Sequence, residues 1–241
     1  QRFQCPFHHW TYGSNGDLLG VPRMKDFGDI DRACHGLIEL PAEEKHGMLW
    51  MHPRPDGQLD VDALLGDLAG ELAGWKCDEL VYMGQSLIEK NLNWKLANDT
   101  FGETYHFSRL HKDTLGNIFY GDALAYDIFG RNHRFIFPSR QIDALRGQPE
   151  EDWRIRGAAT LVYYLFPNIQ FIVGVTGVNL VKIYPDRTNP GRCITRSCHY
   201  FTPKTLELAA EADRTKIDAD NVYDMSARNE GKMHFLSLIH I

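Results

Sequence analysis

The pattern of apolar and polar residues divides the chain into two unequal parts. In the first 54 residues, short apolar runs alternate with glycine, proline and polar turn residues, which is typical of an all-β segment. The clearest turn signal spans residues 12–17, and strand-like runs span residues 36–40 and 47–51. Residues 53–57, with the sequence PRPDG, are the best candidate for a linker.

Longer periodic segments follow this candidate linker. From residue 59 to residue 72, apolar residues recur at spacings of three and four, which predicts an amphipathic helix. Residues 78–90 favour a strand, and the middle of residues 91–113 favours a helix. Further strands are predicted at residues 134–137, 160–166, 170–175, 178–184 and 193–201, and a helix at residues 203–212. The second part is therefore expected to be α+β, with helices packed against a largely antiparallel sheet.

Composition narrows the class of protein. With 43% hydrophobic and 24% charged residues, the 241-residue chain can form a sizeable core. The net charge of −6 offers no basic surface to nucleic acid or to an anionic membrane. The longest apolar run, near residues 158–166, is too short to span a membrane. An odd number of scattered cysteines is a poor disulfide framework, so we expect a cytoplasmic protein. The five are Cys5, Cys34, Cys77, Cys193 and Cys198.

The first chemical signal is the pair Cys5 and His8. A cysteine and a histidine three residues apart on a tight loop can bind the two different irons of a [2Fe–2S] cluster. Such a Rieske cluster needs two cysteines on one iron and two histidines on the other, so this pair supplies half of the ligands. Taken alone, a cysteine and a histidine at this spacing are more often a buried cysteine and an unrelated histidine than a pair of cluster ligands.

The second signal is Glu103, His106 and His111. Two imidazoles and a carboxylate suit a mononuclear non-haem iron, which keeps coordination positions open for dioxygen. On a regular helix, residues five apart differ in direction by about 140°, so the two histidines converge only if a π-bulge or a distorted turn interrupts the helix. Glu103 lies three residues before His106 and can reach the metal region without being a ligand. The alternative is two unrelated histidines.

The residues around both signals resemble one enzyme family. The string CPFHHWTYGSNGDL, which contains Cys5 and His8, resembles the second half of the Rieske motif of ring-hydroxylating oxygenases. The family usually has glycine after the ligand histidine, and this chain has His9 there. Residues 93–111 resemble the mononuclear iron segment of the same family, in the expected order along the chain.

The resemblance implies a role for each of these residues. Cys5 and His8 would bind the [2Fe–2S] cluster, and His106 and His111 would bind the mononuclear iron. Glu103 stands where the family often has the Asp that links the two metal centres across a subunit boundary. Asp99 and Tyr105 would support the iron ligands from behind. Residues of the substrate pocket are not identifiable from the sequence.

The resemblance also implies the domain organisation. Residues 1–54 would be the C-terminal part of an all-β Rieske domain, and residues 55–241 a helix-grip (START-like) catalytic domain with a curved antiparallel sheet. The sequence is expected to lack both ends of the subunit, with the first Cys-x-His pair upstream and the third iron ligand beyond residue 241. The later aspartates are interpreted as solvated surface carboxylates: Asp213, Asp218, Asp220 and Asp224.

The implied function is that of a terminal oxygenase component, the α subunit of a Rieske non-haem iron oxygenase. Electrons from NAD(P)H would arrive through a reductase, with or without a ferredoxin. The Rieske cluster would pass them to a mononuclear Fe(II) that activates dioxygen and hydroxylates or demethylates a small aromatic or apolar substrate, with dioxygenation favoured. A homotrimer, or an α3β3 assembly with a small β subunit, is expected, and the chain alone is expected to be inactive.

An alternative of another class is a non-enzymatic helix-grip protein that binds a ligand without metal. It would bind no iron and would have no use for Cys5 and His8. An electron-transfer Rieske protein is a further alternative, and it would not need His106 and His111.

Overall fold

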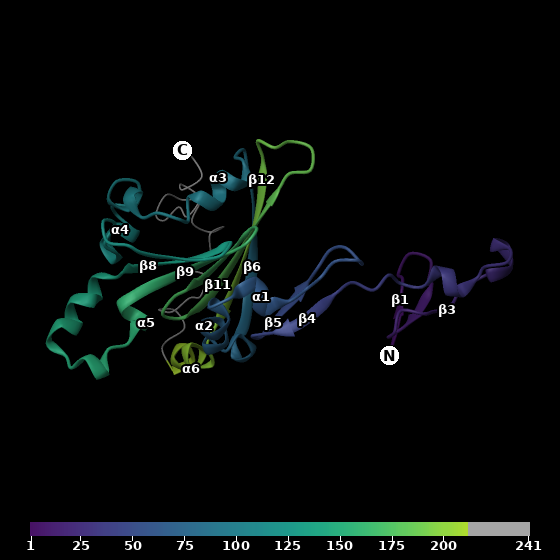
Figure 1. Cartoon of the computed structure of the whole chain (residues 1–241), viewed down its shortest axis with the longest axis horizontal. Helices are drawn as coiled ribbons and strands as arrows, with labels where there is room; N and C mark the ends of the chain where they lie inside the picture. Colours follow the sequence, from purple (N-terminus) through teal and green to yellow (C-terminus); the bar gives the residue numbers. More distant parts are fainter. Residues whose placement is uncertain (212–241) are drawn as a thin grey trace. The chain divides into compact units, whose positions relative to one another are not determined.

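The computed structural model describes residues 1–211, which form two compact units (Figure 1). The first unit is Gln1–Leu64, and the second begins at Leu65. The candidate linker at residues 53–57 is a loop inside the first unit. Each unit is described by itself below.

The first unit is built from short strands. Strands β1, β2 and β3 form a three-stranded antiparallel sheet, and β4 pairs with β5. The turn predicted at residues 12–17 joins β2 to β3, and Gly16 within it has a φ of 88°, a conformation that glycine adopts without steric cost. The strands are Arg2–Gln4 (β1), Thr11–Gly13 (β2), Leu18–Gly20 (β3), Ala42–Lys45 (β4) and Met48–Met51 (β5); two 3-10 helices span Met24–Phe27 and Arg32–His35.

One predicted strand of this unit is wrong. Residues 36–40 have no regular secondary structure, although their sequence is apolar. Ile38 is 75% exposed, so its side chain has no sheet face to cover, and Leu37 donates its backbone N–H to Gly16 O at 2.8 Å. The strand that pairs with β5 is instead β4, whose residues alternate less clearly in hydrophobicity.

The second unit contains a seven-stranded antiparallel sheet with the order β6-β12-β11-β10-β9-β8-β7. Figure 1 shows these strands side by side as a twisted, curved layer. The predicted α+β class is confirmed, and each predicted strand after residue 77 is present. The strands are Val81–Lys90 (β6), Ala125–Phe129 (β7), Asn132–Pro138 (β8), Ala159–Leu165 (β9), Ile169–Val173 (β10), Gly177–Pro185 (β11) and Cys193–Phe201 (β12).

The helix predicted at residues 59–72 is present in two pieces, α1 (Val61–Leu65) and α2 (Leu68–Gly74). Gly66 separates them with a φ of 55°, which is a left-handed conformation that ends the first piece. The predicted apolar face is confirmed, because its members are fully buried. They are Val61, Leu65, Leu68 and Leu72.

Helix α2 is bound to one face of the sheet by a polar network around Tyr163 of β9. The Tyr163 hydroxyl donates to Glu71 Oε2 at 2.9 Å and accepts from Trp75 Nε1 at 3.0 Å. Glu71 in turn forms an ion pair with Arg134 of β8, which also binds Asp127 of β7 at 2.6 Å. Tyr163 is fully buried, so burial raises the pKa of its phenol and the hydroxyl stays protonated.

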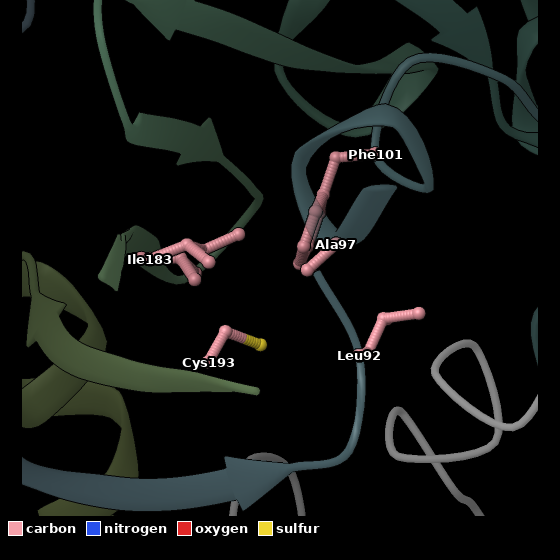
Figure 2. Packing of buried hydrophobic residues seen from close by; sticks show 6 residues of the cluster. Leu92, Ala97, Phe101, Ile183 and Cys193 are labelled. Atoms are coloured by element: carbon pink, nitrogen blue, oxygen red, sulfur yellow. The ribbon is translucent and has the colours of Figure 1, made fainter. Parts of the chain in front are cut away.

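The opposite face of the sheet is covered by α3 (Trp94–Asp99). Ala97 and Phe101 pack against Ile183 of β11 and Cys193 of β12, as Figure 2 shows. A buried amide pair adds to this contact, because Gln170 Nε2 donates to Asn98 Oδ1 at 3.1 Å. The helix begins where the Asn93 side chain accepts the backbone N–H of Lys95 at 2.9 Å.

The helix predicted within residues 91–113 is only partly correct. After α3 the chain forms a 3-10 helix at Tyr105–Ser108, and α4 (Leu115–Ile118) follows after further turns. The helical path ends at Gly102, whose N–H bonds to Asp99 O in a tight turn. Beyond it, Thr104 is buried with its hydroxyl on Gly121 O at 3.0 Å, a long-range bond that a continuous helix could not make.

All five cysteines are free thiols. Burial raises the pKa of Cys77 to about 11, so this thiol is unreactive at neutral pH. Within residues 1–211, none of the helices has the length and apolar character needed to cross a membrane.

Replacing Tyr163 with Phe is expected to destabilise the second unit by about 1–3 kcal/mol, because Trp75 and Glu71 each lose a buried hydrogen-bond partner. Urea unfolding followed by tryptophan fluorescence measures this. Tyr164→Phe is the matched control, since the Tyr164 hydroxyl bonds only to Pro167 O at an exposed position. Equal losses in both variants would refute a structural role for the Tyr163 network.

Candidate metal centre

His106 and His111 are brought together by an interrupted helix. The 3-10 helix Tyr105–Ser108 carries His106, and the turn that follows is closed by a 2.8 Å bond from Leu110 N to His106 O. A wider turn follows His111, whose carbonyl accepts from Gly116 N, five residues on. The two imidazole centroids are consequently 5.4 Å apart. The distorted turn expected from the five-residue spacing is confirmed.

Phe107 attaches this histidine loop (residues 103–121) to the sheet. Its side chain is 6% exposed and packs among Phe135, Phe137 and Val162, on the face of the sheet that α3 also covers. The Phe107 ring centroid is 5.0 Å from His106 and 6.0 Å from His111. The ring therefore supports both imidazoles from the core side.

Both histidines keep one nitrogen without a partner. The Nε2 atoms of His106 and His111 are buried and make no hydrogen bond to any described residue. His111 is 2% exposed, and burial, with a smaller effect from His106, lowers its pKa to about 4. A buried, uncharged imidazole with a free lone pair is the form that binds a transition metal.

Glu103 fixes the orientation of His106. Its carboxylate accepts the Nδ1–H of His106 and the backbone N–H of the same residue, the latter at 3.3 Å. In the neutral tautomer with the proton on Nδ1, which this carboxylate favours, Nε2 is the acceptor, an arrangement common for metal-binding histidines. The Glu103 side chain is 45% exposed, so its other side faces solvent. On His111, Thr114 Oγ1 lies 3.5 Å from Nδ1.

The donor set fits two positions of a mononuclear iron site. No cluster of three or more His, Cys, Asp or Glu side chains that could hold a metal ion is present within residues 1–211. The aspartates considered as a third ligand lie outside the described residues: Asp213, Asp218, Asp220 and Asp224. The two unpartnered Nε2 atoms are thus the part of the site that the structure describes.

Asp99 and Tyr105 lie at the surface. Tyr105 is 86% exposed, and Asp99, the last residue of α3, is also exposed. Among the described residues, neither side chain is hydrogen-bonded to His106 or His111, whose Nδ1 partners are Glu103 and Thr114. A supporting role for Asp99 and Tyr105 stays a prediction.

Cys5 and His8 lie on a tight loop between β1 and β2. The loop is closed by bonds from Cys5 N to Trp10 O at 2.9 Å and from His9 N to Cys5 O at 2.8 Å. The backbone N–H groups of His8 and Phe7 donate to the Cys5 sulfur and lower the pKa of this thiol. A thiolate held by backbone N–H groups suits a cluster ligand, so the loop fits one cysteine and one histidine position of a Rieske cluster.

The backbone conformation at His9 explains why the family usually has glycine at this position. Its φ of 62° lies in the left-handed region, where glycine has no steric penalty and histidine is one of the better-tolerated alternatives. The loop therefore keeps its turn with a histidine at the usual glycine position.

Two glycines that shape the site, Gly116 and Gly121, were not identified from the sequence. An added Cβ at Gly116 would lie 2.9 Å from Phe107 O and 3.1 Å from His111 O, so only glycine lets these backbones approach. Gly121 has the same property, because a Cβ there would lie 3.0 Å from Thr104 O. The available signal was the presence of glycines shortly after a histidine pair in a segment of helical composition.

Comparisons with known proteins show the family of the chain. A profile of the family described as ring hydroxylating alpha subunit (catalytic domain) matches residues 77–230. The chain therefore belongs to this family, the α subunits of Rieske-type ring-hydroxylating oxygenases. It is 31% identical over 115 residues to the glycine betaine monooxygenase oxygenase subunit of Chromohalobacter salexigens, covering 47% of this chain and 25% of that protein.

A second relative is the large oxygenase component of the 2,4-dinitrotoluene dioxygenase system of a Burkholderia species. It is 35% identical over 127 residues, covering 47% of this chain and 26% of that protein. The match thus spans about a quarter of the length of these relatives.

Solved structures show the same fold. A quaternary ammonium Rieske monooxygenase in complex with an inhibitor matches with a TM-score of 0.67 at 19% identity, covering 87% of this chain and 56% of that chain. Naphthalene 1,2-dioxygenase with indole bound matches with a TM-score of 0.61 at 20% identity, covering 90% and 58%. The chain spans little more than half the length of these structures.

Replacing Gly116 with Ala is expected to destabilise the second unit by about 1–3 kcal/mol, because the new methyl group overlaps two backbone carbonyls. Urea unfolding measures the loss. Gly70→Ala in α2 is the control, since an added Cβ there meets no atom within 4 Å and alanine favours the helix. A Gly116→Ala variant as stable as Gly70→Ala would contradict the close approach.

Replacing Glu103 with Ala is expected to weaken iron binding by about 10–100-fold, because His106 loses the group that holds its tautomer. Equilibrium dialysis against buffered Fe(II) measures the affinity. Glu79→Ala is the matched control, since Glu79 also forms an i,i+3 ion pair, with Lys76. Unchanged affinity in Glu103→Ala would exclude the positioning role.

Proposed function

We propose that this chain is part of the terminal oxygenase component of a Rieske oxygenase system. The observation that carries the proposal is the pair of buried, unpartnered Nε2 atoms on His106 and His111, whose rings are 5.4 Å apart. Membership of the ring-hydroxylating family supports the assignment of these two nitrogens to a mononuclear iron. Residues 1–54 are proposed as part of the Rieske domain and residues 55–241 as the catalytic domain.

Each residue has a defined task in this proposal. His106 and His111 present neutral nitrogens to the metal, and Phe107 excludes water from the core side of both rings. Cys5 and His8 hold one sulfur and one nitrogen position of the [2Fe–2S] cluster. When bound, the cluster supplies electrons, and the Fe(II) supplies the open coordination positions at which dioxygen is activated.

Glu103 is proposed as the link between the two centres. One side of its carboxylate holds the Nδ1 proton of His106, and the side chain is 45% exposed, so a neighbouring subunit can reach the other side. The carboxylate can therefore accept or release a proton as charge moves between the centres. Asp99 and Tyr105 are proposed as supporting residues at the rim of the site.

The relatives support the proposed reaction class and partners. A large oxygenase component of a dioxygenase system works with other components, so we propose a reductase that draws on NAD(P)H, with or without a ferredoxin. The proposed assembly is a homotrimer or an α3β3 complex, located in the cytoplasm in keeping with five free thiols. The proposed substrate is small and aromatic or apolar, with dioxygenation preferred over monooxygenation and demethylation.

The His106→Ala and His111→Ala variants of the iron-loaded oxygenase are each expected to lose the mononuclear iron while keeping the cluster, because each removes one ligand nitrogen. Metal analysis measures the iron, and the visible absorption spectrum reports the cluster. His133→Phe is the matched control, since His133 is a half-buried histidine of the same unit whose ring stacks on Tyr164, at 4.6 Å between ring centroids.

Two results would contradict the proposal. Full iron content and turnover in His106→Ala would remove this histidine from the metal site. A wild-type protein that binds a small apolar ligand but neither iron nor cluster would support the metal-free helix-grip alternative instead.

A further inference from the structure

One row of residues runs across the sheet beneath the histidine loop. Direct cross-strand partners point to the same face, and the pairs Phe135–Val162, Val162–Ile172 and Ile172–Asn179 connect β8, β9, β10 and β11. Phe107 packs against Phe135 and Val162, and Ile172 contacts the same cluster. Asn179 is therefore the first polar residue of a row that otherwise supports the imidazoles.

The neighbouring row on this face is also polar at β12 and β6. Val181 of β11 pairs with Ser197, and Ser197 pairs with Ser86. Cross-strand partners have Cβ atoms about 4.5–5.5 Å apart, which places Ser197 beside Ser86. Asn179 is the diagonal neighbour of Ser197 and is joined to it by a side-chain hydrogen bond. We call these three residues the polar patch.

The hydrogen bonds of the polar patch leave one hydroxyl, that of Ser86, without a partner among the described residues. Ser197 is 1% exposed, and its hydroxyl donates to Asn179 Oδ1 at 2.7 Å. This bond holds the Oδ1 side of the amide, and the Asn179 side chain is half-buried. Ser86 Oγ is buried and makes no hydrogen bond within residues 1–211. Polar groups buried without partners cost stability, which a purely structural patch would avoid.

The charges on these strands favour a neutral ligand group. Lys182 and Arg196, the nearest lysine and arginine on β11 and β12, pair with each other and alternate onto the opposite face of the sheet. His199 of β12 pairs with Asn179 on the same face, so an imidazole adjoins the patch. The patch itself offers only an amide and hydroxyls. Carboxylates are usually met by an arginine fork, so these neutral donors match a carbonyl, amide or nitro oxygen better.

We propose that the polar patch of Asn179, Ser197 and Ser86 binds a neutral hydrogen-bond acceptor on the substrate and orients it toward His106 and His111. This inference rests on the proposed oxygenase function and narrows its substrate class. The substrate is an aromatic or apolar molecule that carries a carbonyl, amide or nitro oxygen, and a plain hydrocarbon binds more weakly.

The test compares the binding of two probes of equal shape, acetophenone and α-methylstyrene, which differ by a carbonyl oxygen in place of a methylene. Calorimetric titration of the iron-loaded oxygenase without reductant measures both affinities. The wild type is expected to prefer acetophenone, and Asn179→Leu is expected to reduce that preference about two- to tenfold, the value of one neutral hydrogen bond. Ser86→Ala is expected to do the same and removes only one oxygen, so it carries the test if Asn179→Leu fails to fold.

Lys182→Leu is the matched control, because it lies on β11 but on the opposite face, and its preference is expected to equal that of the wild type. An unchanged preference in folded Asn179→Leu and Ser86→Ala overturns the inference, and so does a wild type that binds neither probe. The titration measures binding without turnover. Either of these two results, in a protein that retains its iron, therefore contradicts the polar patch and leaves the proposed oxygenase function unaffected. Failure of the proposed function shows separately, as a wild type without iron.

Discussion

The packing of Phe107 into the sheet is the constraint on which the candidate metal centre depends. This side chain sits between His106 and His111 in sequence and fills a space among Phe135, Phe137 and Val162. A regular helix would turn the two histidines apart. Because the phenyl ring is fixed in the core, the backbone on each side takes 3-10 and wider turns, and both imidazoles lie over the same ring.

Around Phe107, the surroundings of each histidine determine its protonation. Glu103 holds the proton of His106 on Nδ1, and burial keeps His111 neutral at ordinary pH. Such an arrangement costs stability, since two buried nitrogens lack a partner among residues 1–211, and a bound metal would recover that cost. The family match is consistent with iron as that metal.

The two faces of the seven-stranded sheet have different roles. One face binds α2 through the Tyr163 network, in which every buried polar atom of Tyr163 has a partner. The other face carries α3, the histidine loop and the polar patch. Within residues 1–211, Ser86 Oγ is the atom of the polar patch that has no hydrogen-bond partner.

The sequence by itself indicated the family, the α+β class and six of the seven strands after residue 77, all but β7, because these depend on local composition and spacing. It also singled out the residues proposed for both metal motifs. It gave a wrong strand at residues 36–40 and too long a helix before His111, since exposure and long-range bonds such as Thr104 to Gly121 override local propensity. Only the tertiary structure decided that the histidines converge, that Gly116 must be glycine and that Asn179 shares a row with Ile172. Each of these depends on a contact with a distant part of the fold, which spacing along the chain does not encode.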